Sequence, residues 1–219
     1  QIIGLRFYRD PNLGPRRGQN YTSIPNFLFV GGSGSGAAAT CDLGQNTSIL
    51  GKAANENSVL NFCVEQQINY IALYDCNLLN WGSTTSTNLS APGTNILAAF
   101  MRKARASGIT EIGAVRSASQ AKTNQLVAYN NSRALASERF EWYNIENEWW
   151  NGDVSFAQYL SNIQYAHDQS TGATNPMKVE IYIGWPDPGE MVQLLPYLER
   201  VLVHDYPPSK QPDYNYTRG

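Results

Sequence analysis

Residues 140–148 have the sequence FEWYNIENE, whose aromatic residues and isoleucine favour a β-strand. Patterns typical of helices lie on both sides of this stretch, at about 119–137 and 155–169. The alternation extends over the rest of the chain. Further strands are predicted at 2–8, 68–75, 111–116, 178–185 and 200–206, and further helices at 58–67, 94–107 and 188–199. Strands that alternate with helices predict an α/β fold with a parallel sheet.

Two α/β architectures fit this order. A doubly wound sheet often binds a nucleotide at a glycine-rich turn directly after its first strand. Here the glycine-rich segment Gly31–Gly36 lies well beyond the predicted strand at 2–8, and it lacks the lysine of a phosphate-binding loop. We therefore predict a (β/α)8 TIM-barrel-like fold, of which this chain supplies about six βα units. Residues 1–219 are expected to form a single barrel domain, incomplete at its C-terminus, with a long loop at 10–57.

The composition excludes several classes of protein. The chain has 16 lysine and arginine residues against 18 acidic residues, so it offers no strongly basic surface for nucleic acid. No apolar run approaches the roughly 18 residues required to cross a bilayer, so no membrane span is expected. Charged residues make up only 16% of the chain, and asparagine, serine and threonine supply much of its polarity. This balance favours a secreted protein with an extracellular or cell-surface location.

The cysteines and the glycosylation motifs also bear on whether the protein is secreted. Cys63 lies on the apolar side of the predicted helix at 58–67 and is expected to be buried, which leaves Cys41 and Cys76 as the candidate disulfide. The cysteine spacing matches no zinc motif, and neither a metal nor an organic cofactor is expected. The Asn-x-Ser/Thr motifs predict a glycoprotein. They begin at Asn20, Asn46, Asn88, Asn130 and Asn215.

The predicted strand at 140–148 carries the candidate chemistry. Side chains alternate along a strand, so Tyr143 and Ile145 suit a helix layer. Asn144, Glu146 and Glu148 then face the barrel interior, where burying an unpaired carboxylate costs several kcal/mol. Two like charges on one face oppose each other's ionisation, so one of the two glutamates is expected to hold a proton near neutral pH. A protonated carboxyl group is what a glycosidic oxygen requires in order to leave.

The segment 141–148 (EWYNIENE) resembles the D-x-x-D-x-D-x-E signature on the fourth strand of chitinase-like family 18 glycoside hydrolases. The resemblance implies a TIM barrel in which Glu148 is the general acid/base. It places Glu146 at the aspartate that orients the N-acetyl group of the substrate, and Asn144 at a buried supporting aspartate. Of the four signature acids, only the last is unchanged. The longer side chain of Glu146 also moves the orienting carboxylate by a full methylene group.

A second resemblance involves the pair Asn147 and Glu148, which is similar to the Asn-Glu pair at the end of strand four in clan A glycosidases. It implies the same acid/base role for Glu148 and a nucleophilic glutamate on strand seven, whereas the predicted strands end at the sixth. Glu146 and Glu148 are neighbours on one strand and cannot easily bracket a sugar ring from opposite sides. A two-carboxylate mechanism therefore needs another acid. The candidates are Asp75, Glu180 and Asp205, or an acid outside this sequence.

Aromatic side chains lie at or just beyond the predicted strand ends, where rings can stack on the faces of sugars. The first resemblance also places His204 and Asp205 where the family has a Tyr-Asp pair that contacts the sugar. We predict Glu148 and Glu146 as the catalytic residues. The predicted substrate-binding residues are Asn144, Asn147, Tyr8, Tyr74, Trp149, Trp185, His204, Asp205 and Tyr206.

These features favour a glycoside hydrolase-like protein that cleaves or binds a polysaccharide or glycan. The alternative is a catalytically inactive TIM-barrel domain with a carbohydrate-binding or extracellular structural role, which the altered signature acids favour. A nucleotide-binding doubly wound domain is a third possibility. Glu148 could also belong to an inert polar core, since Arg6 and Arg116 are available to neutralise the fourth strand. The sequence indicates no oligomeric state.

Overall fold

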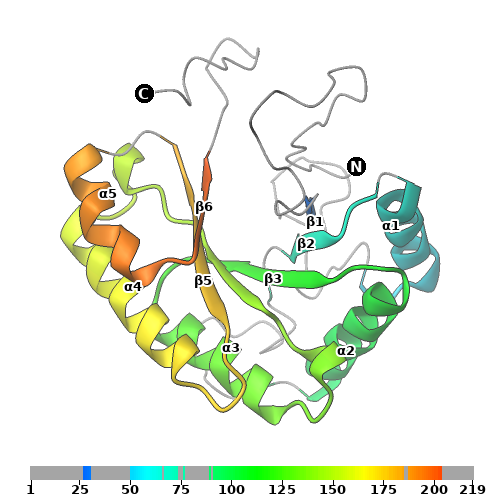
Figure 1. Ribbon diagram of the computed structural model, residues 1–219. Coiled ribbons are helices and arrows are strands. Elements are labelled where there is room, and N and C mark those ends of the chain that lie inside the picture. Colours follow the sequence, from blue (N-terminus) through cyan, green and yellow to red (C-terminus); the bar gives the residue numbers. More distant parts are fainter. Residues whose placement is uncertain are drawn as a thin grey trace, which may run out of the picture.

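The computed structural model describes residues 27–30, 50–65, 67–73, 76, 89, 91–184 and 187–203 of the chain. Strands and helices alternate in this part of the chain, as the sequence predicts (Figure 1). The strands are β1 (Phe27–Val30), β2 (Tyr70–Leu73), β3 (Glu111–Arg116), β4 (Trp142–Ile145), β5 (Lys178–Ile183) and β6 (Arg200–Val203). The helices are α1 (Ala53–Glu65), α2 (Ala91–Ala106), α3 (Gln120–Ser132), α4 (Phe156–Thr171) and α5 (Pro188–Leu194). Short 3₁₀ helices are η3 (Ala136–Glu138), η4 (Trp149–Asn151) and η5 (Leu195–Tyr197).

The described strands form one sheet in the order β1-β2-β3-β4-β5-β6, and every neighbouring pair is parallel. This order follows the sequence without a reversal, whereas a doubly wound sheet reverses its direction at a switch point. The doubly wound alternative is therefore excluded for these strands. Figure 1 shows a curled sheet with the helices along its outer side. The described chain thus has the form of part of an α/β barrel.

Side-chain alternation divides the buried residues of the sheet into two layers. Ile71, Ile112, Tyr143 and Ile181 belong to the main apolar core, which packs the sheet against its helices. The residues between them face the concave side of the sheet, where a smaller cluster lies. It consists of Tyr70, Ala72, Val115, Trp142, Tyr182 and Leu202. Because a fully buried aliphatic side chain contributes about 1.5–3 kcal/mol, the larger layer supplies most of the apolar stabilisation.

The sequence predictions agree with the structure where the residue pattern is strongly periodic. Strand β3 has the predicted bounds, and Tyr143 and Ile145 join the helix-facing core as expected. Cys63 of α1 is fully enclosed in that core, which confirms the prediction that it is a small buried residue. Burial raises the pKa of its thiol to about 11.

Other predicted segments have to be corrected. Strand β1 and the start of α1 lie inside the segment 10–57, so the prediction of a continuous loop there is wrong. The predicted strand at 2–8 lies outside the described residues. Helix α3 ends before the predicted residue 137 because Arg133 takes an extended backbone. Strand β4 ends at Ile145 because the chain turns into η4 soon afterwards, at Trp149.

Local capping explains where the helices next to the carboxyl edge of the sheet begin. Ser119 caps α3 and Ser155 caps α4, each by accepting a hydrogen bond from a backbone N–H in the first turn. Asp187 and Glu190 form a capping box at the start of α5. Each cap of this kind is worth about 1 kcal/mol. The caps therefore fix where the helices after β3, β4 and β5 begin.

Close packing on the concave side requires one glycine. Tyr70 of β2 lies across Gly113 of β3, and a Cβ atom at position 113 would collide with the Tyr70 hydroxyl oxygen. A larger residue at this position would have to displace the tyrosine. The missing side chain lets the Tyr70 hydroxyl reach past β3 to Glu180 on β5.

Candidate functional site

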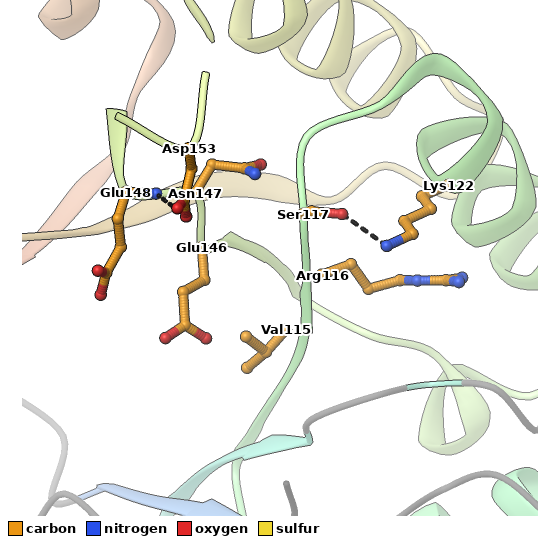
Figure 2. A pocket seen from close by; sticks show the side chains of 8 residues that line it. All are labelled: Val115, Arg116, Ser117, Lys122, Glu146, Asn147, Glu148 and Asp153. Carbon is orange, nitrogen blue, oxygen red and sulfur yellow. Dashed lines mark hydrogen bonds between the residues drawn. The ribbon is translucent and has the colours of Figure 1, made fainter. Parts of the chain in front are cut away.

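A pocket of about 340 Å³ lies at the carboxyl ends of β3 and β4. Its walls come from the end of β3, the start of α3 and the segment after β4 (Figure 2). The lining residues are Val115, Arg116, Ser117, Lys122, Glu146, Asn147, Glu148 and Asp153. Ligands of parallel α/β sheets bind at this edge. The structure thus brings Glu146 and Glu148 together in a hollow where binding residues of such folds collect.

Glu146 and Glu148 follow directly after β4. The backbone N–H of Glu146 still donates to the carbonyl of Arg116 at 3.2 Å, which continues the contact with β3. Figure 2 shows both carboxylates on the same side of the chain and the Asn147 side chain on the other side. The alternation expected of a strand therefore persists beyond Ile145. Both glutamates are partly buried, a condition that suits groups meeting a ligand.

Asn147 holds the chain between the two glutamates. Its Oδ1 atom accepts a hydrogen bond from the backbone N–H of Ala118, in the connection between β3 and α3. This bond ties the exit of β4 to the exit of β3, so that two walls of the pocket are joined. Because the amide oxygen of Asn147 already binds the backbone, the geometry supports a positioning role better than the predicted contact with substrate.

Glu148 lies at the start of a tight turn that holds both its backbone and its carboxylate. Its N–H donates to Oδ2 of Asp153 at 3.3 Å. Its Oε2 atom accepts a hydrogen bond from the side-chain amide of Asn151. Gly152 completes the turn with a φ of 89°, in the left-handed region that glycine adopts without strain. The turn after β4, rather than the strand itself, holds the candidate acid.

The wall formed by β3 and α3 carries the positive charges of the pocket. Arg116 is buried, and its Nη1 atom donates to Oε1 of Gln125 at 2.9 Å. Lys122 Nζ donates to the hydroxyl of Ser117 at 2.5 Å. Figure 2 shows the guanidinium of Arg116 directed away from both carboxylates. The geometry therefore does not support an inert core in which Arg116 neutralises the fourth strand, and Arg6 lies outside the described residues.

A second acidic centre lies on the concave side of the sheet, nearer to the amino ends of the strands than the pocket. Glu180 of β5 is 0% exposed. Tyr70 Oη and Asn144 Nδ2 both donate to its Oε1 atom, the amide at 2.8 Å. Arg200 Nε donates to its Oε2 atom at 2.5 Å and Nη1 continues to Glu111 at 3.2 Å. These five residues, Tyr70, Glu111, Asn144, Glu180 and Arg200, are termed the concave network.

Aromatic rings enclose the guanidinium of this network. The central carbon of Arg200 lies 3.7 Å from the ring centroid of Trp142 and 4.6 Å from that of Tyr70. Burial raises the pKa of Glu180, while Arg200, Tyr70 and Asn144 oppose this shift. Because both carboxylate oxygens are bound in the interior, Glu180 is excluded as the second acid of a two-carboxylate mechanism.

Asn144 belongs to the concave network and not to the pocket. Its side chain is fully buried, and its amide donates to Glu180 on the neighbouring strand. The prediction that Asn144 binds substrate therefore has to be corrected, because a ligand cannot reach a side chain enclosed between β4 and β5. Its location agrees with the buried supporting position that the family resemblance implies.

Trp149 also requires correction. It is only 6% exposed, and its ring stacks on that of Tyr159 with the centroids 4.2 Å apart. Its indole N–H donates to Oε2 of Glu190 at 2.8 Å, and Trp150 packs against it edge-on. The aromatic side chains of α4 and the carboxylate of Glu190 hold the ring in the helix layer. Trp149 thus anchors η4 next to Glu148 and presents no face for a sugar.

Several predicted residues lie outside the described part of the chain, and their roles stay predictions. They are Tyr8, Cys41, Tyr74, Trp185, His204, Asp205 and Tyr206. Cys76, the second cysteine of the predicted disulfide, is buried, and its Sγ atom lies 3.5 Å from the carbonyl oxygen of Leu73. The predicted disulfide is therefore untested.

Sequence reasoning overlooked three polar residues of the pocket. Asp153 follows Asn151 and Gly152, an Asn-Gly pair that is a strong turn signal. A turn directly after a strand with a candidate acid could have identified Asp153. Ser117 and Lys122 come from the preceding βα unit, and no local pattern relates them to Glu148.

One predicted glycosylation motif is buried in the folded protein. The side chain of Asn130 is fully buried. It accepts a hydrogen bond from the N–H of Phe140 at 3.0 Å and donates one to the carbonyl of the same residue at 2.9 Å. A glycan has no room on a side chain enclosed in this way, so Asn130 is not an acceptor in the folded protein. The other motifs, at Asn20, Asn46, Asn88 and Asn215, lie outside the described residues.

No protein-family model matches the chain, and no curated protein matches it either. Within the described ranges, no three His, Cys, Asp or Glu residues are grouped so that they could hold a metal ion. The helices of this same part of the chain include none that is long and apolar enough to cross a membrane. The geometry of the pocket is therefore the main indication of function.

Proposed function

We propose that this chain belongs to a secreted glycoside hydrolase-like protein of TIM-barrel type, whose pocket binds a polysaccharide or glycan with Glu148 as general acid/base. The observation that supports this most strongly is the pair of carboxylates, Glu146 and Glu148, on one side of the chain in a pocket at the carboxyl edge. The sequential, curled parallel sheet is consistent with a barrel. The closed barrel and the extracellular location are parts of the proposal.

The proposed chemistry is a proton transfer to the oxygen that leaves the sugar. A protonated Glu148 donates to the glycosidic oxygen as the bond from that oxygen to the anomeric carbon breaks. Glu146 lies beside Glu148 on the same side of the chain. Asn151 and Asp153 hold the acid in place through its carboxylate and its backbone N–H.

The positions of the acids in the pocket limit which group can act together with Glu148. The described acids of the pocket all come from the segment 146–153, which forms one wall. A mechanism with carboxylates on opposite faces of the sugar therefore needs an acid outside the described residues, such as Asp75 or Asp205. Assistance by the substrate's own N-acetyl group instead requires an acid beside Glu148, and Glu146 is the candidate among the described residues.

A carbohydrate-binding barrel without catalysis is the second candidate. Asn144 cannot ionise where the resemblance has a buried aspartate, and its amide is committed to Glu180. Trp149 is withdrawn into the helix layer, so one predicted stacking ring is lost. The Asn144 observation favours binding over cleavage, whereas the lost ring weakens both candidates equally.

Hydrolysis and binding assays with chitin, xylan, mannan and β-glucan test the two candidates. Glu148→Gln removes the acidic proton with little change of shape, and we expect a loss of turnover of about 10²–10⁴-fold with binding retained. Glu65→Gln makes the same chemical change at an exposed position of α1 and serves as the control. Binding without turnover in the unmodified protein would favour the second candidate, and absence of both would contradict the proposal.

A further inference from the structure

We infer that Asn151 is a site of spontaneous modification, at which its side-chain amide converts to a carboxylate beside Glu148. Asn151 and Gly152 form the only Asn-Gly pair in the sequence. Both residues are exposed, at the end of η4. The inference concerns the chemistry of the chain itself and does not depend on the proposed function.

The reaction joins a backbone nitrogen to the neighbouring side chain. The nitrogen of Gly152 loses its proton to solvent base and bonds to Cγ of Asn151, while the Cγ–Nδ2 bond breaks. Ammonia leaves after taking a proton from water. The resulting five-membered succinimide then adds water and opens at either carbonyl, which produces aspartate or isoaspartate. Solvent water is the only co-reactant.

The surroundings of Gly152 permit this attack. A Cβ atom built at position 152 has no atom within 4 Å beyond those of its two chain neighbours, so solvent can approach the glycine. The absence of that Cβ atom also leaves the nitrogen unhindered. The N–H of Gly152 donates to the carbonyl of Trp149 at 3.0 Å, and this bond has to open first. It belongs to a single 3₁₀ turn, and short turns of this kind open locally at small free-energy cost.

The buried part of the turn confines this opening to its exposed end. Trp149 is held by Tyr159 and Glu190, so the start of η4 stays in place. Residues 151–153 are all exposed. Local opening can therefore reach Asn151 without unfolding the sheet.

Conversion of the Asn151 amide to a carboxylate replaces an attractive contact with Glu148 by a repulsive one. In the native turn the amide of Asn151 donates to Oε2 of Glu148, and Asp153 accepts the backbone N–H of Glu148. A carboxylate at position 151 has no proton to donate at neutral pH. It also adds a negative charge next to the charges of Glu148 and Asp153. We expect the turn to open and Glu148 to lose its fixed orientation.

Incubation at mildly alkaline pH followed by peptide mass spectrometry tests the modification. The expected result is an amide-to-acid mass gain, with isoaspartate, several-fold faster at Asn151 than at Asn131. Asn131 is also exposed but precedes serine, so it is an internal comparator. In Asn151→Gln the longer side chain disfavours the five-membered ring, and this position should stay unmodified. Conversion at Asn151 that is no faster than at Asn131 would overturn the inference.

The effect on Glu148 is tested with Asn151→Asp, which installs one product directly, against Asn151→Gln, which retains an amide donor. We expect Asn151→Asp to have the lower melting temperature at neutral pH. The difference should shrink below about pH 4, where carboxyl groups are protonated. Equal melting temperatures at neutral pH would contradict the proposed repulsion. Neither measurement uses a glycan, so a failure here is distinguishable from a failure of the proposed function.

Discussion

The pocket and the concave network contain carboxylates on the inner side of the same sheet, and their surroundings differ. Glu180 in the network is fully buried, and three side chains donate to its two oxygens. Glu146 and Glu148 in the pocket are only partly buried. Residues of the same turn hold Glu148, through bonds to Asn151 and Asp153. Glu180 is therefore part of the interior, whereas Glu146 and Glu148 remain within reach of a ligand.

The difference follows from position along the strands. Tyr70, Glu111 and Arg200 are the first residues of β2, β3 and β6, and Glu180 lies inside β5, so ordered strands surround the network. Glu146 and Glu148 lie beyond the last residue of β4, where no neighbouring strand among the described residues covers them. In α/β barrels the amino edge contributes stability and the carboxyl edge contributes function. The comparison therefore predicts large stability effects in the network and small ones in the pocket.

The largest effect is expected for Arg200→Ala, which leaves Glu180 buried with its main counter-charge removed. The free energy of unfolding should fall by about 3–5 kcal/mol, measured by urea denaturation. Arg102→Ala removes an ion pair to Glu138 whose arginine is far more exposed, and it should cost less than about 1 kcal/mol. A loss as small as that of Arg102→Ala would mean that the network does not stabilise the sheet through this pair.

Gly113→Ala tests the close approach of Tyr70 to β3. It should cause the next largest loss of stability. The new Cβ atom would collide with the tyrosine hydroxyl, and we expect a loss of about 1–3 kcal/mol in urea denaturation. Tyr70→Phe removes the colliding atom, so Gly113→Ala should cost less when it is combined with Tyr70→Phe than when it is made alone. Equal costs in the two cases would show that the clash is relieved in another way.

The pH dependence of stability tests the charge state of Glu180. Burial raises its folded-state pKa, so the folded state binds a proton more tightly than the unfolded state. The stability contributed by this proton is present below the unfolded pKa of about 4.3 and is lost as pH rises through the folded pKa. The unfolding free energy of the unmodified protein, relative to Glu180→Gln, should therefore decrease from about pH 4 toward neutral pH. A constant difference across that range would contradict the raised pKa.

Glu148→Gln should have the smallest effect on stability. Its carboxylate is partly exposed and is held by its own turn, so we expect a change within about 0.5 kcal/mol. Urea denaturation beside Glu65→Gln provides the comparison. A loss comparable to that of Arg200→Ala would make Glu148 a structural residue, and the contrast between the two regions would disappear.

Local signals in the sequence predicted much of the fold. Ser119 and Ser155 begin helices because a cap depends only on the first turn. The alternation of Glu146, Asn147 and Glu148 predicted which side chains share a face, and Figure 2 shows that arrangement. The positions of Asn144 on the candidate strand and of Trp149 directly after it predict contact with a substrate. Their burial depends on α4 and on β5, which pack against them only in the folded chain.

Local sequence patterns predict the order of strands and helices from α1 to β6 and the face that each strand residue takes, because both depend on neighbours within a few positions. Which polar groups meet depends instead on the folding of the whole sheet. Glu180 joins Tyr70 across the sheet, and Lys122 and Asp153 line one pocket from two different βα units. Such contacts form only when the sheet curls and its helices pack on the outer side. Whether a carboxylate is enclosed or accessible is therefore a property of the folded chain, set by the residues that surround it in space.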